Sequence, residues 1–103
     1  MTYEIMTTDE FETWINNIDD LLAVATIRKH LQRIKDGNLG KTRQVCGDIY
    51  EKKINYAGGY RLYYFIKIRQ VIVMLVGGTK RTQQRDIKMA QQIRKDIYDR
   101  DIT

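Results

Sequence analysis

The stretch GGYRLYYFIKIRQVIVMLVGGTKRTQQRDIKMA, residues 58–90, decides the fold. It contains two apolar runs, residues 60–67 and 71–76, and the short polar turn near residues 68–69 predicts that they form an antiparallel hairpin. The second run is apolar on both faces of a strand, so it belongs inside a sheet that is covered on both sides. Thr82 can cap a following helix, so the stretch predicts strand, strand and helix.

Outward from this stretch, the sequence predicts one strand, two helices and then a further strand. A capping-box pattern at residues 7–10 marks the start of the first helix, and Gly37 ends the second. Residues 37–47 predict a loop. The expected bounds are residues 3–6 and 49–55 for the strands, and about 9–18 and 20–35 for the helices. The order β-α-α-β-β-β-α predicts one α+β domain over residues 1–103, with a C-terminal antiparallel sheet packed by helices.

The composition excludes several classes of protein. The chain has 103 residues, 43% of them hydrophobic and 30% charged, which is typical of one soluble globular domain. No apolar run is long enough to span a membrane, and the N-terminal residues lack a signal-peptide pattern. The single cysteine excludes an internal disulfide and a cysteine-based zinc cage. We therefore expect a cytoplasmic protein.

The charges are distributed very unevenly along the chain. Residues 1–26 carry a net charge of −6, residues 27–85 carry +11, and the charges of residues 86–103 cancel. A segment this basic favours a polyanionic partner, because neutralising phosphates supplies much of the affinity for nucleic acid. A solvated basic surface is an equally good interpretation of charge alone.

The connection YAGGY, residues 56–60, predicts how two strands pair. Its glycines tolerate the backbone conformation of a hairpin turn. If the two tyrosines face each other, Asn55 lies opposite Arg61 and Lys53 lies opposite Tyr63. Because strand side chains alternate, Lys53, Asn55, Arg61 and Tyr63 then share one face of the sheet.

A cationic loop is predicted to reach the same place. Counting back from the turn near residues 68–69 places Arg61 beside residues 76–77, at the mouth of the loop that carries Lys80 and Arg81. The amides at the start of the last helix add to an anion site, and arginines bind phosphate oxygens through two nitrogens. A cleft with Lys, Arg and Tyr and no acidic pair suits a phosphodiester and its pentacovalent transition state.

Two interpretations of these residues remain open. A lysine with a lowered pKa, Lys53 or Lys80, or else Tyr63, could accept the proton of a ribose 2′-hydroxyl. In the structural alternative, Arg61 pairs with Asp86 or another carboxylate of the last helix, and the tyrosines only pack. The chain has one histidine, which excludes a two-histidine ribonuclease mechanism.

The motifs resemble those of a known family. The runs EKKINYAGGYRLYYF, residues 51–65, and LVGGTKRTQQRDIKMAQQI, residues 75–93, resemble the RelE/ParE toxin superfamily. More narrowly, they are similar to its HigB-like "addiction module killer protein" branch. The loop GNLGKTRQV, residues 37–45, is also similar to a segment of that branch. The resemblance covers about residues 9–98, nearly the whole chain.

This resemblance implies a RelE-like fold and a toxin of a type II toxin–antitoxin system. RelE-like members cleave mRNA in the ribosomal A site, with the 2′-hydroxyl as nucleophile and without a metal or other cofactor. ParE-like members instead inhibit DNA gyrase and are not nucleases, so the activity must be argued from the site. A third possibility is a nucleic-acid-binding module without catalytic power. The implied partners are mRNA on the ribosome and a cognate antitoxin of the helix-turn-helix type, which together with the toxin would bind operator DNA.

The resemblance also implies roles for single residues. Arg61 matches the family's GYR arginine and would stabilise the phosphate in the transition state. Lys80 matches the lysine after the glycine pair, and Asp86 would orient Arg61 or Lys80. The catalytic candidates are Arg61, Tyr63, Lys80, Arg81 and Lys53. The RNA-binding or supporting candidates are Asn55, Arg85, Asp86 and Lys52, and no residue is predicted to hold a metal.

Overall fold

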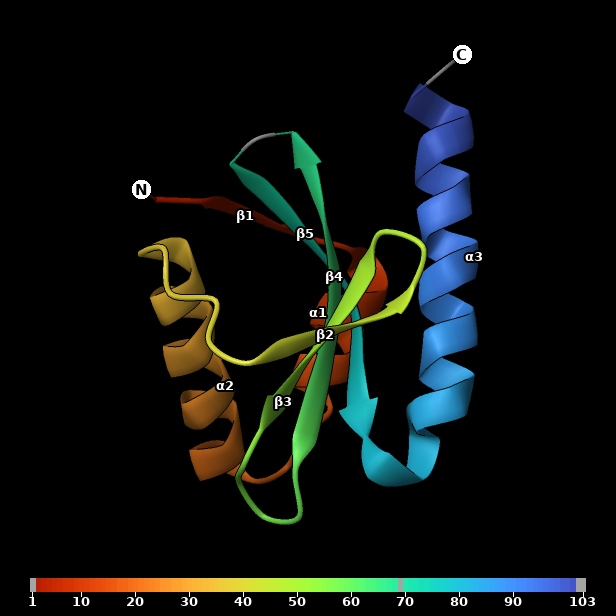
Figure 1. Cartoon of the computed structure of the whole chain (residues 1–103). Helices are drawn as coiled ribbons and strands as arrows, with labels where there is room; N and C mark the ends of the chain where they lie inside the picture. The colour runs from red at the N-terminus through yellow and green to blue at the C-terminus, as the bar shows by residue number, and fades with distance from the viewer. Residues whose placement is uncertain (1, 69, 102–103) are drawn as a thin grey trace.

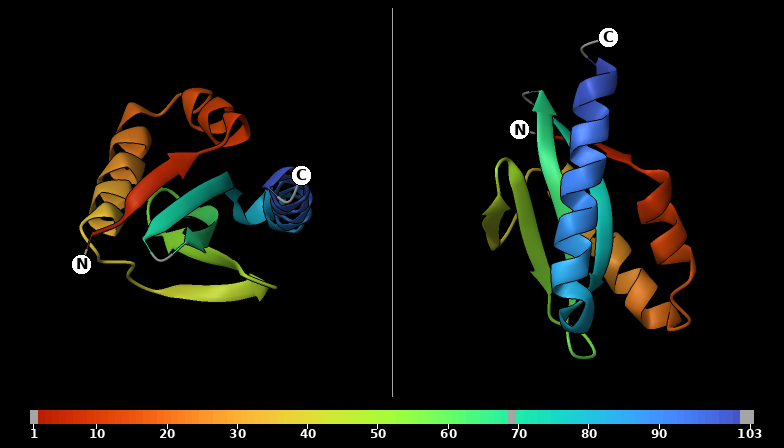
Figure 2. Two further views of the ribbon diagram at one scale, coloured as in Figure 1. Left: turned by 90° about the horizontal axis from the view of Figure 1, so that it is seen from above. Right: turned by 90° about the vertical axis from the view of Figure 1, so that its right-hand side faces the viewer.

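Three helices enclose a five-stranded sheet, with α1 and α2 on one face and α3 on the other (Figures 1 and 2). The computed structural model describes residues 2–68 and 70–101. The elements are β1 (Glu4–Thr7), α1 (Asp9–Asn16), α2 (Leu21–Lys35), β2 (Thr42–Cys46), β3 (Ile49–Ile54), β4 (Tyr60–Ile68), β5 (Val71–Thr79), the 3₁₀ turn η1 (Lys80–Thr82) and α3 (Gln83–Asp101). The predicted α+β class is confirmed.

The strand order in the sheet is β1-β5-β4-β3-β2. β1 pairs with β5 in parallel, and the other three pairs are antiparallel. β5 is buried from Ile72 to Gly78, which confirms that it is an internal strand covered on both sides. The turn predicted between β4 and β5 includes residue 69, which lies outside the described residues.

Polar caps explain where the first two helices begin. The Thr8 hydroxyl accepts a hydrogen bond from the Phe11 amide at 3.0 Å, and the Asp20 carboxylate accepts bonds from the amides of Leu22 and Ala23. Both caps satisfy amides that have no partner within the first turn of a helix. Both helices therefore begin close to the positions that the sequence predicts.

Each face of the sheet has its own hydrophobic cluster. The cluster under α1 and α2 contains Phe11, Ile15, Ile27, Ile34, Leu62, Tyr64 and Met74, among others. The cluster under α3 contains Tyr63, Phe65, Leu75, Ala90, Ile93 and Ile97, among others. Residues of β4 alternate between the two clusters, as strand geometry requires. Within the described part of the chain, no helix combines the length and the apolar character needed to cross a membrane.

The prediction of a loop over residues 37–47 is wrong in its second half. Residues 42–46 form β2, which pairs with β3 and makes one edge of the sheet. None of its residues is fully buried. An edge strand of this kind carries no run of buried apolar residues, so the sequence pattern does not reveal it.

The predicted pairing of β3 with β4 is also displaced. Ile54, not Tyr56, lies opposite Tyr60, so Lys53 faces Arg61. The displacement is even, so Lys53 and Arg61 still share a face, whereas Asn55 falls beyond the end of β3. The hairpin is longer than predicted, and it contains three successive positive φ angles, beginning at Ala57.

β5 runs further than predicted. It continues through both glycines of the GG pair, so Arg61 lies opposite Gly78 rather than beside residues 76–77. Neither glycine needs a positive φ angle. Both positions instead lack space for a side chain. A Cβ atom on Gly77 would overlap the Trp14 ring, and one on Gly78 would overlap the Asp86 carboxylate.

Candidate functional site

A cationic cleft opens where β2, β3 and β4 meet the beginning of α3. Its volume is about 520 Å³. It is lined by Lys41, Thr42, Arg43, Glu51, Lys53, Arg61 and Gln83. Four of these side chains are cations and one is a carboxylate, so the cleft has a net positive charge and suits an anionic ligand.

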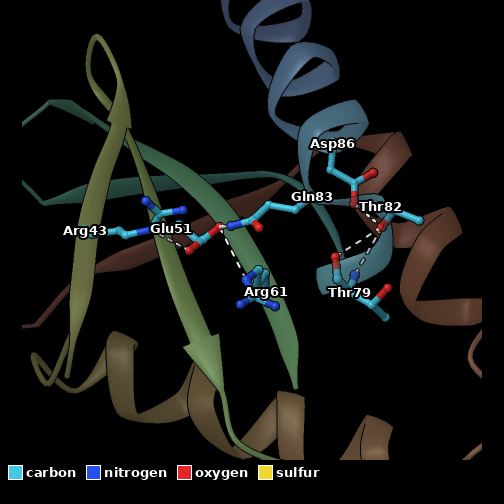
Figure 3. A network of polar contacts seen from close by, with 7 residues as sticks. All are labelled: Arg43, Glu51, Arg61, Thr79, Thr82, Gln83 and Asp86. Carbon is cyan, nitrogen blue, oxygen red and sulfur yellow. Dashed lines mark hydrogen bonds and ion pairs between the residues drawn. The ribbon is translucent and has the colours of Figure 1, made fainter. Parts of the chain in front are cut away.

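Glu51 lies at the centre of the polar contacts in this cleft (Figure 3). The Arg43 Nε atom donates to Glu51 Oε1 at 2.8 Å, and the Gln83 amide donates to Oε2 at 2.7 Å. Arg61 Nε lies 3.6 Å from the same Oε2 atom. The Glu51 carboxylate thus accepts hydrogen bonds from the edge strand β2 and from the first residue of α3, and it forms a longer ion pair with the central strand β4.

The pKa of Glu51 reflects two opposing effects. Burial disfavours the carboxylate form and acts to raise the pKa, since only 5% of the residue is exposed. Hydrogen bonding from Arg43 and Gln83, together with the nearby Tyr63 hydroxyl, outweighs burial and lowers the pKa below its ordinary value. Glu51 is therefore ionised at neutral pH, and its charge balances part of the arginine charge.

Arg61 is buried but incompletely bonded. The residue is 8% exposed, and its Nε and Nη1 atoms have no hydrogen-bond partner among the described residues. The 3.6 Å separation from Glu51 is an ion pair that is too long for a good hydrogen bond. Both nitrogens are shielded from solvent, so a ligand would meet the guanidinium from the cleft that Arg61 lines. Guanidinium groups bind phosphate oxygens in this way.

Tyr63 lies in the core rather than in the cleft. Its exposure is 0%, and its hydroxyl has no hydrogen bond of normal geometry among the described residues. Burial, followed by the influence of the Glu51 carboxylate, raises the pKa of Tyr63 well above 10.0. Its position in the core and its raised pKa do not support the predicted role of Tyr63 as a base, which stays a prediction.

Asp86 does not orient Arg61. This carboxylate is 4% exposed and accepts a hydrogen bond from the Thr82 hydroxyl, and its Oδ1 atom lies 3.6 Å from Arg85. In Figure 3 the contacts among Asp86, Thr82 and Thr79 form a group at the start of α3, separate from the contacts of Glu51. The prediction that Asp86 orients Arg61 or Lys80 is therefore wrong, and so is the structural alternative that pairs Arg61 with Asp86.

The predicted cationic loop lies near the cleft without lining it. Lys80 and Arg81 are exposed in η1, directly after Thr79, which pairs with Tyr60 at the beginning of β4. Neither side chain is among those that line the cleft. The predicted proximity of this loop to β4 is confirmed. Convergence of these cations on Arg61 is not observed.

The three remaining predicted residues lie in other places. Lys52 is on the opposite face of β3, where its ammonium group donates to the Leu39 carbonyl at 2.9 Å, so a supporting role in this cleft is contradicted. Arg85 lines a separate cavity beside Trp14. Asn55 lines a shallow depression of the hairpin, which it shares with Lys53. Of the nine predicted residues, Arg61 and Lys53 line the cleft.

Five further cleft residues were missed by sequence reasoning: Lys41, Thr42, Arg43, Glu51 and Gln83. One signal pointed to Glu51, which is one of three acids within the +11 segment of residues 27–85 and lies two residues before Lys53. Strand alternation places both side chains on one face, so the predicted cations had a carboxylate beside them. The positions of Lys41 and Arg43 in the cleft could not be predicted, because the sequence pattern did not reveal β2.

Comparison with known proteins shows the family. The family model "Phage derived protein Gp49-like" matches residues 13–96. The chain belongs to the Gp49-like family. An uncharacterised Haemophilus influenzae protein is 34% identical over 97 residues, which covers 94% of this chain and 98% of that protein. The similarity of this Gp49-like chain to that relative thus extends over nearly the full length of both.

Solved structures show that this Gp49-like chain has the fold of RelE toxins. A mutant of the E. coli toxin RelE in the free state superposes with a TM-score of 0.70 at 16% identity, covering 90% of this chain and 99% of RelE. The toxin–antitoxin complex RelBE2 of Mycobacterium tuberculosis contains a chain with a TM-score of 0.60 at 14% identity, covering 78% of this chain and 100% of that one. At such identities the likeness concerns the fold.

The donor set of the cleft suits an anion better than a metal ion. Throughout residues 2–68 and 70–101, no group of three or more His, Cys, Asp or Glu side chains is placed to hold a metal. The cleft instead presents guanidinium and ammonium groups, which bind phosphate or carboxylate.

Proposed function

We propose that this protein is the toxin of a type II toxin–antitoxin system and cleaves mRNA on the ribosome. The observation that supports this proposal is Arg61, a buried guanidinium with two unpartnered nitrogens that lines a cationic cleft. The RelE fold supports the same conclusion, because it is the fold of toxins that are crystallised with antitoxins. The HigB-like branch remains part of the proposal.

The proposed reaction is an internal phosphoryl transfer. The ribose 2′-hydroxyl loses its proton as its oxygen attacks the neighbouring phosphorus, and the bond to the 5′-oxygen breaks as that oxygen takes up a proton. The products are a 2′,3′-cyclic phosphate and a 5′-hydroxyl end. Negative charge accumulates on the non-bridging oxygens in the transition state, so donors aimed at them accelerate the reaction. Arg61 lines the cleft, and its guanidinium would donate to these oxygens from there.

Lys53 and Glu51 would assist Arg61 in different ways. Lys53 lies opposite Arg61 in the sheet and lines the cleft, so it supplies a second positive charge to the same phosphate. Glu51 would act as a positioning residue, because its carboxylate holds Arg43 and Gln83 while it pairs with Arg61. Lys80 and Arg81, exposed beside the beginning of β4, would contact the RNA outside the cleft.

The proposed partner is an antitoxin that covers the cationic cleft. The RelBE structures of E. coli and M. tuberculosis are toxin–antitoxin complexes with this fold. A helix-turn-helix antitoxin would neutralise this chain and direct the pair to operator DNA. Its contact surface should carry acidic side chains, because the cleft is lined by four cations and one carboxylate.

The deciding experiment maps new RNA 5′ ends after brief induction of the protein in cells. We expect cuts within translated reading frames. We expect Arg61→Ala to reduce the rate of RNA cleavage by a factor of about 10² or more, because a preorganised donor to the transition state is lost. Lys88→Ala is the matched control, since Lys88 is an exposed cation of α3 that does not line the cleft. Circular dichroism and thermal unfolding would establish that each variant folds.

Two results would contradict the proposal. Undiminished cleavage by a folded Arg61→Ala variant would remove Arg61 from the chemistry. Growth arrest without RNA cuts, accompanied by DNA damage while translation continues, would instead identify an inhibitor of DNA gyrase like the ParE proteins. RNA binding without either effect would indicate a binding module.

A further inference from the structure

We propose that Lys41 and Arg43 form a second phosphate subsite, so that the cleft holds two successive phosphates of one single-stranded RNA. This inference rests on the proposed function. It specifies in addition how many phosphates of the RNA are bound and in which direction the strand crosses the sheet. The first phosphate would lie at Arg61 and Lys53, and the second towards the β2 edge of the sheet. The RNA strand would therefore run across β4, β3 and β2 rather than along them.

Arg43 carries the first part of this inference. Its Nε atom is committed to Glu51 at 2.8 Å, which fixes the position of the guanidinium. Its side chain is nevertheless 60% exposed, and its two Nη atoms have no partner among residues 2–68 and 70–101. A guanidinium that is oriented through Nε and open at both Nη atoms is preorganised for a second ligand, and phosphate oxygens fit that fork.

Lys41 joins these cations at the β2 edge of the cleft. It directly precedes Thr42, which pairs with Lys52, and the next residue of β3, Lys53, is opposite Arg61. The cleft is lined by Lys41, Lys53, Arg61 and Arg43, whereas Lys52 does not line it. Lys41 directly precedes β2 and Arg43 is its second residue, and both side chains line the cleft.

Glu51 separates the two cationic subsites. Its Oε1 atom contacts Arg43 and its Oε2 atom faces Arg61, so the carboxylate lies between the two guanidinium groups. A single phosphate cannot occupy this position, because the carboxylate would repel it. The two arginines would therefore bind separate phosphates, one on each side of the Glu51 carboxylate.

The test uses two ligands that differ by one phosphate. They are a dinucleoside monophosphate and a trinucleoside diphosphate, both with 2′-O-methyl riboses so that they cannot be cleaved. Affinities of the full-length protein are measured by titration calorimetry at several salt concentrations. Lys41→Ala is the main variant, because Lys41 makes no hydrogen bond or ion pair with Glu51 among the contacts in the described structure. Arg43→Ala is the second variant, and Lys88→Ala is the control.

We expect Lys41→Ala to weaken the trinucleotide by about fivefold or more and to leave the dinucleotide unchanged. Arg43→Ala also frees the Glu51 carboxylate, so it should weaken both ligands but the trinucleotide more. The slope of log affinity against log salt for the trinucleotide should fall by about 0.7 when a phosphate contact is lost. Arg61→Ala should weaken both ligands. If Arg61→Ala weakens both while the β2 variants weaken neither, the second subsite is overturned and the proposed function stands. If Arg61→Ala affects neither ligand, both proposals fail.

Discussion

Glu51 shows how one side chain can organise a site without reacting in it. It is the carboxylate of a cleft lined by four cations, and its oxygens hold Arg43 and Gln83 and face Arg61. A neutral residue at this position would leave the guanidinium groups to repel each other. The carboxylate therefore sets both the spacing and the orientation of the arginines.

Glu51→Gln should destabilise the fold in a pH-dependent way. Since the folded protein lowers the pKa of Glu51 below its ordinary 4.5, ionised Glu51 contributes stability at pH values above 4.5, and this contribution is lost as pH falls through the lower folded value. We expect the variant to lose about 1–3 kcal/mol of unfolding free energy at pH 7. Urea denaturation from pH 7 to pH 3 should show the difference between wild type and variant shrinking below pH 4.5. A difference that does not change with pH would contradict this account.

Tyr63→Phe should leave catalysis nearly intact. The Tyr63 hydroxyl is inaccessible to solvent and has a raised pKa, so its loss removes no group that an RNA could reach. We expect the rate of cleavage to change by less than about threefold, in contrast to the loss of about 10² for Arg61→Ala. A large loss of cleavage in a Tyr63→Phe variant of normal stability would show that the hydroxyl enters the reaction.

Among single residues, the sequence led to Arg61 and Lys53 but not to Arg43 or Glu51. Arg61 and Lys53 lie on strands with clear alternation, and an even error in register leaves side chains on the same face. Asp86 was expected to serve Arg61, but α3 directs it towards Thr82 instead. Whether Glu51 or Asp86 pairs with Arg61 depends on how α3 packs against the sheet. The local sequence around either carboxylate does not determine that packing.

At the level of elements, the start of α3 is fixed to the sheet at two points. Gln83 bonds to Glu51 on β3, and the Asp86 carboxylate occupies the space above Gly78 on β5. A helix that is held at both points keeps its first turn against the cleft. Gly78 therefore influences the site although its own atoms do not line it.

Gly78→Ala should displace the first turn of α3. The added Cβ atom would overlap Asp86 Oδ2 and the Thr82 hydroxyl, and we expect a loss of about 1–3 kcal/mol in unfolding free energy from overpacking. Asp86→Ala in the same chain should recover part of this loss, so the two substitutions should be coupled in a double-mutant cycle. Additive effects in urea denaturation would show that the predicted overlap is absent.

β2 and the β3–β4 hairpin show why elements were harder to predict than the fold class. The internal strands β4 and β5 are long and apolar, and the helices have polar caps, so both kinds of element were correctly placed. β2 is an edge strand with two basic neighbours at its start, Lys41 and Arg43, and its partner is decided by β3 rather than by its own composition. The length of a hairpin loop that contains Ala57 in a positive φ conformation could not be read from the glycines alone.

Across the whole molecule, two separate clusters share one sheet. β4 and β5 contribute side chains to both clusters, whereas β2 lies at an edge and contributes partly buried residues. The acidic helix α1 packs on the face opposite to Arg61, so the negative charge of the first residues is kept apart from the cleft. The fold thus places the acidic first helix and the cationic cleft on opposite faces of the sheet.

Hydrogen exchange should reveal this unequal coverage. We expect β2 amides that bond to β3 to exchange about tenfold or more faster than β5 amides that bond to β4, because β5 is buried on both faces and β2 opens at an edge. Native-state exchange followed by NMR would measure both sets in one sample. Equal protection would mean that the sheet opens as a single unit.

The two adjacent glycines of β5 are constrained by different neighbours. Position 77 is constrained by Trp14 of α1, and position 78 by Thr82 and Asp86 on the other side of the sheet. In related chains, a side chain at position 77 should therefore accompany a residue smaller than tryptophan at position 14. A side chain at position 78 should accompany changes at positions 82 or 86. Positions 77 and 78 should thus vary independently of each other among related chains. Changes at position 77 should accompany changes in α1, and changes at position 78 should accompany changes at the start of α3.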